Sequence, residues 1–282
     1  MTVRGAHPPA DKRRLALVAA ILGSFVVGLD GTVVNVALPS ISKDLGGGLA
    51  GQQWISNAYL LLLGSLILVG GSLGDVFGER RVFTTGVIGF GVASLVCAIT
   101  PSVELLVVAR GLQGVFGALL APSALAVIVA VFPPDERGGA IGSWTAWQAI
   151  SGVVGPFAGG WLIDQASWRW IFAINVPFVI VTVLLIAVAV PGRDGSENAR
   201  RVDWFGAALC AVGLAGPVYA LIHQPQVGWG SWEVSVPLIG GLAIFASFLA
   251  YEARAKDPML PLGLFRRRNF WAGNLETLAM YG

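Results

Sequence analysis

The sequence predicts an all-α integral membrane protein, and its composition and its long apolar runs are the two observations behind this prediction. Charged residues make up 12% of the chain, half of the ~25% typical of soluble domains. The residues A, V, I, L, M, F, W, Y and C reach 55% before 38 glycines are added. A soluble fold of this size cannot bury so much apolar surface, so the lipid bilayer is the expected solvent.

Apolar runs long enough to cross a membrane recur along the whole chain. A helix of about 20 residues, rising ~1.5 Å per residue, spans a hydrocarbon core of ~30 Å. A ninth run begins at Phe270 and reaches only Gly282, so the chain is expected to be truncated within a ninth helix. Eight complete spans are expected before it, at residues 15–38, 53–73, 82–100, 104–131, 139–163, 169–190, 204–222 and 233–251.

These spans predict the organisation of the chain. The stretch 191–203, PGRDGSENARRVD, is the most polar between spans and is the best candidate linker. The expected segments are a cytoplasmic N-terminal segment 1–14, a six-helix bundle 15–190, the cytoplasmic linker 191–203, two additional membrane helices 204–251, a cytoplasmic loop 252–269 and an incomplete ninth helix 270–282.

Basic residues lie mostly on one side of the expected spans. With the N-terminus inside, the inner segments hold 15 of the 18 Lys and Arg residues. The outer segments hold Lys43 and Arg169, and Arg110 lies within a span. Because cytoplasmic flanks are enriched in Lys and Arg, we expect a multi-pass protein of the cytoplasmic membrane with a cytoplasmic N-terminus.

Three other classes of protein are disfavoured. The net charge of +2, with basic residues confined to short segments, argues against nucleic-acid binding. Cys97 and Cys210 lie in apolar runs without CxxC or Cys/His spacing, so neither a metal site nor a disulfide is expected. No HExxH motif is present, and His7 and His223 are isolated, so an enzyme is not expected.

Two ionisable residues lie deep inside expected spans, where a charge is costly and is by default a functional hypothesis. Asp30 follows Leu15 by 15 residues on an outward-running helix, which places it about 22 Å from the inner boundary. Arg110 follows Leu105 on an inward-running helix and lies at a similar depth, again about 22 Å. We expect a proton-coupling or substrate site at this depth. The alternative is a static Asp–Arg pair that fixes the helix register.

The helix around Arg110 carries further signals. Gln113, at i+3, adds an amide beside the guanidinium. Small residues on the same face allow close helix approach or leave room for a cavity, and they are Gly114, Gly117 and Ala121. Asn35 points about 140° away from Asp30 on its helix, so we expect it to bond a neighbouring helix.

The expected fifth span combines proline with glycine. It contains Gly155-Pro156 followed by Gly159-Gly160. Proline removes a backbone hydrogen bond and kinks a helix, while flanking glycines let a neighbour pack closely. The alternative is an ordinary packing kink.

Several motifs resemble those of a known family. Residues 29–39, LDGTVVNVALP, resemble the first-helix signature of the 14-helix drug:proton antiporter branch of the major facilitator superfamily. Residues 71–81, GSLGDVFGERR, are similar to the superfamily's loop motif between helices two and three. Residues 110–114, RGLQG, resemble the fourth-helix motif associated with proton coupling.

The fifth and sixth spans extend the resemblance over essentially the whole chain. Residues 168–172, WRWIF, and 175–177, NVP, recur in this branch. The fifth-helix antiporter motif is matched by Gly142, Ser151, Gly155, Pro156, Gly159 and Gly160. Ser151 stands where the motif usually has glycine, and Val76 and Glu79 stand where the loop motif usually has basic residues.

The resemblance implies a fold and a function. It implies a major facilitator-type N-terminal six-helix bundle, two extra helices and the start of a ninth. It implies proton-coupled efflux of small amphipathic or cationic molecules, such as drugs, driven by the proton gradient without a cofactor. The residues implied for proton coupling or substrate are Asp30, Arg110 and Gln113, and those implied for the gating loop are Gly71, Asp75, Gly78, Arg80 and Arg81.

One alternative function stays open at this point. A central transport site needs walls from two halves, so the partner is a second half or another copy of the chain. Without such a partner, the chain would be a non-transporting membrane interaction protein or an inactive transporter fragment.

Overall fold

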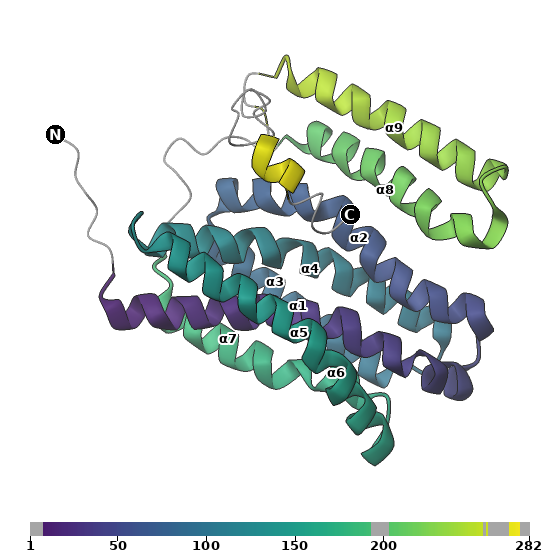
Figure 1. The fold of residues 1–282 in the computed structure, drawn as a ribbon, viewed down its shortest axis with the longest axis horizontal. Helices are drawn as coiled ribbons and strands as arrows, with labels where there is room; N and C mark the ends of the chain where they lie inside the picture. The colour runs from purple at the N-terminus through teal and green to yellow at the C-terminus, as the bar shows by residue number, and fades with distance from the viewer. Residues whose placement is uncertain (1–7, 193–202, 256–257, 259–270, 277–282) are drawn as a thin grey trace. The chain divides into compact units, whose positions relative to one another are not determined.

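The computed structural model describes residues 8–192, 203–255, 258 and 271–276, and every regular element in these ranges is a helix. The chain divides into two compact units, Met1–Ala199 and Arg200–Gly282. In the first unit the long helices run side by side (Figure 1), and they are α1 (Ala10–Leu45), α2 (Gly48–Phe77), α3 (Glu79–Ile99), α4 (Val103–Val131), α5 (Arg137–Gln165) and α7 (Asn175–Ala189). The short helix α6 (Trp170–Ala173) directly precedes α7. The second unit contains α8 (Trp204–Val227), α9 (Trp232–Glu252) and a helical segment at 271–276.

The all-α membrane fold predicted from the sequence is confirmed. Seven helical segments of the described chain are long and apolar enough to cross a bilayer, and these are α1, α2, α3, α4, α6 with α7, α8 and α9. The helix α5 has 29 residues, enough to cross, but its serines, glycines and glutamine make it less apolar. Its expected span, 139–163, therefore stays a prediction. Most of the run 270–282 lies outside the described residues.

Helix ends differ from the expected span ends. α1 has 36 residues and α2 has 30, so both extend past the apolar runs at 15–38 and 53–73. Hydropathy marks the length of a helix that lies within the hydrocarbon core, whereas a glycine with positive φ marks the end of the helix itself. Gly46 and Gly47, with φ of 79° and 83°, end α1, and Gly78, with φ of 87°, separates α2 from α3.

The expected single span 169–190 is broken. α6 ends at Ala173, and α7 begins at Asn175. Pro177 has no N–H to donate to the Ala173 carbonyl, so the hydrogen-bond ladder is interrupted here. The two helices together still form one segment long enough to cross the membrane, Trp170–Ala189, as the sequence predicted. The break within it has a consequence for the functional site.

Glycines bring the helices of the first unit into close contact. A Cβ atom at Gly114 of α4 would lie 2.4 Å from the Tyr59 carbonyl oxygen of α2. A Cβ atom at Gly155 of α5 would lie 2.0 Å from Thr32 Oγ1 of α1. Real Cβ atoms do not come so close to other heavy atoms, so these helix pairs depend on glycine.

The first unit has two apolar cores with a polar layer between them. One core includes Val26 of α1, Phe90 of α3 and Leu120 of α4. The other includes Val33 of α1 and Cys97 of α3. The residues between these positions on each helix include the charged and polar side chains described below.

In the second unit, α8 and α9 also pack through glycine. A Cβ atom at Gly216 would lie 2.4 Å from the Pro237 carbonyl oxygen. Asp203 caps α8 by accepting a hydrogen bond from the Gly206 amide at 2.8 Å, and the Tyr251 hydroxyl of α9 donates to the same carboxylate at 3.3 Å. The hairpin is therefore tied at its inter-helix face and at one end.

We predict that Gly155→Ala destabilises the first unit, whereas Gly160→Ala does not. The added methyl group at position 155 would overlap Thr32, and overpacking of this kind costs about 1–3 kcal/mol. Gly160 lies on the same helix and has no atom within 4 Å of an added Cβ, so it is a matched control. The measurement is the thermal midpoint of the detergent-solubilised chain. It is the temperature at which half of the monodisperse peak in size-exclusion chromatography is lost after heating. Equal midpoints for the two variants would contradict the packing argument.

Candidate functional site: a buried polar layer

A buried ion pair lies at the centre of the first unit. The Arg110 guanidinium donates through Nη1 to the Asp30 carboxylate. The side chains are 1% and 0% exposed, respectively. The contact places the two side chains at the same level of α1 and α4, as the sequence predicted, while their depth in the membrane stays a prediction. Removing two charges from water is expensive unless their other hydrogen-bonding atoms are also satisfied.

Gln113 satisfies atoms on both members of the pair. Its Oε1 accepts from Arg110 Nη1 at 2.6 Å, and its Nε2 donates to Asp30 Oδ1 at 2.9 Å. The second Nε2 hydrogen goes to Ser94 Oγ at 3.2 Å, and Cys97 Sγ donates to Oε1 at 3.7 Å. The amide is therefore held in one orientation by its neighbours.

Asn175 and Ser94 complete the layer, and the sequence reasoning did not single them out as site residues. Asn175 Nδ2 donates to Asp30 Oδ1 at 3.1 Å and to Ser94 Oγ at 2.9 Å. Ser94 donates its own hydrogen to the Phe172 carbonyl at 2.9 Å. Asn175 is the first residue of α7, so the break before it positions the amide. The recurring NVP motif was the available signal, because Pro177 predicts a helix start nearby.

The Arg110 guanidinium is also held by α2. Its Nε donates to the Ile55 carbonyl at 3.1 Å, and its Cζ lies 4.2 Å from the centre of the Tyr59 ring. The Phe172 ring lies 5.8 Å away. Cation–π contacts of this kind strengthen when water is excluded. The Tyr59 hydroxyl donates to the Val27 carbonyl at 3.2 Å, which fixes the ring.

The predicted gating-loop residues lie away from the polar layer. Residues 71–77 form the end of α2 rather than a loop, and Gly78 alone makes the turn. Asp75 and Arg81 are exposed, and Gly71 lies beside Pro122 of α4. Arg80 donates to the Ala187 carbonyl of α7 at 3.3 Å.

The antiporter-motif residues of α5 pack against α1. A Cβ atom at Gly159 would lie 2.7 Å from Val33, so Gly155 and Gly159 both allow close approach, whereas Gly160 faces open space. Pro156 is exposed on a helix that continues through it. Ser151 Oγ lies 2.2 Å from a Cβ built on Gly28, so the opposing glycine makes room for this serine.

Two further contacts tie other ends of the helices together. Asn35 accepts from Ser56 Oγ of α2 at 3.2 Å, so the expectation that it bonds a neighbouring helix is confirmed. Asp44, near the end of α1, accepts from Arg169 Nη1 at 2.7 Å and from Trp168 Nε1 at 3.0 Å. This exposed cluster joins α1 to the segment that precedes α6.

Comparison with known proteins identifies the family. A family model described as the Major Facilitator Superfamily matches residues 20–273. The chain belongs to this superfamily. The resemblance noted in the sequence motifs is thereby confirmed, and the chain is a multi-pass membrane protein of a transporter family rather than a member of an enzyme family.

Several relatives are named as resistance or export proteins. The chain is 39% identical over 279 residues to a puromycin resistance protein of Streptomyces alboniger, covering 97% of this chain and 55% of the relative. It is 37% identical over 279 residues to the tetracenomycin C resistance and export protein of Streptomyces glaucescens, covering 98% and 52%. It is 38% identical over 257 residues to the multidrug resistance protein Stp of Mycobacterium tuberculosis, covering 91% and 48%. The chain thus spans about half the length of these relatives.

Solved structures show the same fold. A crystal structure of a peptide transporter, POT, in complex with sulfate superposes with a TM-score of 0.63 at 19% identity. The match covers 91% of this chain and 54% of the transporter. At this identity the likeness concerns the fold alone.

We predict strong energetic coupling between Asp30 and Arg110. Asp30→Asn or Arg110→Met alone leaves a buried partner without its counter-charge, which costs about 3–5 kcal/mol. The double variant removes both charges, so it should lose less stability than the sum of the single variants. The measurement is a double-mutant cycle on the free energy of unfolding in detergent micelles. The exposed pair Asp44 and Arg169, replaced in the same way, is the matched control and should show little coupling. Additive losses at the buried pair would be inconsistent with the geometry described.

Proposed function

We propose that this chain forms the N-terminal part of a proton-coupled exporter of small amphipathic or cationic molecules in the cytoplasmic membrane. The observation that carries the proposal is the Asp30 carboxylate, fully buried among membrane-crossing helices and bonded to Arg110, Gln113 and Asn175. An ionisable group in this position is by default a functional one. The resistance and export functions named for relatives support the same direction of transport.

Asp30 is the proposed proton carrier. In its ionised form the carboxylate attracts Arg110 and would also favour a cationic substrate. A bound proton removes this charge and weakens both attractions, which favours substrate release and a rearrangement of the helices. The energy source is then the proton gradient, and no cofactor is required.

A second set of helices is part of the proposal. Transporters of this superfamily alternate access by rocking two halves about a site between them. Because the chain spans about half the length of its relatives, the other half would come from further sequence or from another copy. Asp75 is exposed at the end of α2, where it is available to contact such helices and form the gate.

The proposed orientation has the N-terminus in the cytoplasm. Fifteen of the 18 basic residues fall on that side of the expected spans, and such residues oppose translocation. In this orientation Arg80 and Arg81, at the start of α3, flank the cytoplasmic gate.

We predict that Asp30→Asn abolishes proton-driven efflux in a complete transporter that contains this segment. The amide is nearly the same size as the carboxyl but cannot carry a proton or a charge. Glu104→Gln, at the exposed start of α4, changes a carboxyl outside the polar layer and should leave efflux intact. The measurement is efflux of a fluorescent amphipathic cation from vesicles under an imposed proton gradient, normalised to the amount of inserted protein. Undiminished gradient-driven efflux by Asp30→Asn would remove Asp30 from the mechanism.

We also predict that the 282-residue chain alone inserts with a cytoplasmic N-terminus but exports nothing. Insertion follows from the length of its helices and the distribution of basic residues. Export should fail because one half supplies only one wall of the central site. Protease protection of an N-terminal tag reports the topology, and dye movement in proteoliposomes reports transport. Gradient-dependent dye movement that Asp30→Asn abolishes would mean that copies of this chain assemble into a working transporter.

A further inference from the structure

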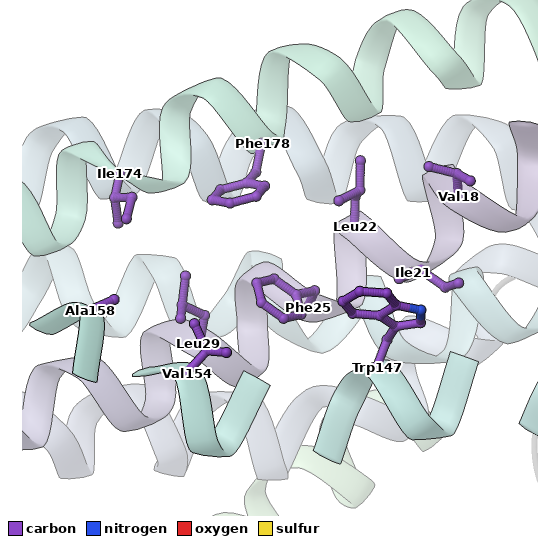
Figure 2. A pocket seen from close by; sticks show the side chains of 10 residues that line it. All are labelled: Val18, Ile21, Leu22, Phe25, Leu29, Trp147, Val154, Ala158, Ile174 and Phe178. Carbon is purple, nitrogen blue, oxygen red and sulfur yellow. The ribbon is translucent and has the colours of Figure 1, made fainter. Parts of the chain in front are cut away.

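An apolar slot lies between α1, α5 and α7 of the first unit. Figure 2 shows its lining side chains in a row along the helices, from Val18 at one end to Leu29 and Ile174 at the other. The cavity has a volume of about 300 Å³, which is at the lower end of the range for small-molecule sites. Among the described residues that line it, the indole nitrogen of Trp147 is the only polar side-chain atom. The lining therefore fits a hydrocarbon.

Packed aromatic rings give the slot a defined wall. Phe25 contacts Trp147 of α5 edge-on, with ring centres 6.4 Å apart, and Phe178 of α7 with ring centres 5.9 Å apart. Val18 and Trp147 are exposed, so the slot opens at the surface of the unit. Because these helices cross the membrane, that surface faces lipid unless another helix covers it.

The length of the slot matches one lipid leaflet. Val18 and Leu29 are 11 residues apart on α1, which corresponds to about 16 Å along the helix. Half of a hydrocarbon core of ~30 Å is about 15 Å. A single acyl chain from the inner leaflet, lying along the helix axis, would therefore fill the slot from Val18 to about Phe25, which lies near the bilayer midplane.

An exposed cation, Arg14, lies at the end of the slot nearest the start of α1. Arg14 precedes Val18 by four residues, so it lies one helical turn away on the same face of α1. Arg14 is exposed, and no salt bridge engages it within the described chain. Arg13 differs, because its Nη1 pairs with Glu136 at 3.2 Å. A guanidinium in this place attracts a lipid phosphate and repels a cationic transport substrate.

We propose that the slot binds one acyl chain of an anionic phospholipid from the leaflet around the start of α1, and that Arg14 pairs with its phosphate. The lipid would fill the groove that α5 and α7 leave over α1 and would hold these helices at a fixed separation. This site is separate from the polar layer, and it does not depend on the direction of transport.

A second apolar hollow provides a comparison. It lies between α3 and α7 with a volume of about 310 Å³, and it is lined by residues such as Ile88 and Val92. No aromatic ring lines it among the described residues, and the residues one turn before Ile88 are Thr84 and Thr85. The nearest basic residues on α3, Arg80 and Arg81, lie two turns before Ile88 and are both engaged within the chain, Arg80 with the Ala187 carbonyl. We expect this hollow to take up acyl chains without preference for an anionic head group.

The test uses the full 282-residue chain in phosphatidylcholine bilayers that contain a small fraction of lipid with brominated acyl chains. Bromine quenches tryptophan fluorescence on contact, and subtraction of the Trp147→Phe variant isolates the signal of Trp147. We expect brominated phosphatidylglycerol to quench Trp147 more strongly than brominated phosphatidylcholine at the same fraction. Arg14→Gln should abolish this difference, whereas Arg13→Gln should preserve it.

The comparison hollow and a competitor make the outcome decisive. Val92→Trp in the Trp147→Phe background should be quenched equally by both lipids. A preference for the anionic lipid at this introduced tryptophan equal to that at Trp147 would show that this lipid is enriched all around the protein, and it would overturn the proposal. An unchanged preference in Arg14→Gln would also overturn it. Absence of quenching by either lipid would mean that protein covers the slot. Relief of quenching by tetraphenylphosphonium would assign the slot to transport substrates instead.

Discussion

Two opposite charges are buried where neither water nor lipid can solvate them, and this constraint organises the first unit. Such a pair is tolerated only when its remaining donors and acceptors find partners. Asp30 of α1 and Arg110 of α4 therefore need Ser94 from α3, Asn175 from α7, and the Ile55 carbonyl of α2. Five helices are tied to one another at a single level. The apolar cores on either side of this level keep water away from it.

The polar layer also dictates where backbones must come close. Arg110 reaches the Ile55 carbonyl because Gly114, one turn further along α4, lets that helix touch the backbone of α2 at Tyr59. Asn175 reaches Asp30 because the helix ladder is interrupted immediately before it. Glycine contacts and a proline-induced break, which are unfavourable in isolated helices, are thus the means by which short side chains meet across the bundle.

Much of this arrangement was predictable from the sequence, for physical reasons that differ between residues. The rise of a helix fixes depth, so Asp30 and Arg110 were expected to meet, and the i+3 spacing placed Gln113 beside them. Ser94 and Asn175 were not expected at the site, because neutral polar residues in membrane helices have many possible partners and depth alone does not give the rotation of a helix about its axis. Hydropathy likewise located spans well, but it did not reveal the break before Asn175.

The hydrogen bonds of the layer bear on the proposal that Asp30 binds a proton. With Asp30 ionised, both neighbouring amides offer it N–H groups, and the Gln113 oxygen is already engaged by Arg110. A proton on Asp30 would add a donor, and among the described residues of the layer Asn175 Oδ1 is the buried acceptor left without a partner. Reversal of the Asn175 amide would present this oxygen to the protonated carboxyl and to the Ser94 hydrogen, which would leave the Phe172 carbonyl. The same reversal would put the Asn175 Nδ2 donor in the position where the oxygen has no partner. Both changes fall at the break between α6 and α7. The unpartnered oxygen is therefore the acceptor through which the layer would accommodate the proposed protonation of Asp30, at the cost of one unpartnered donor.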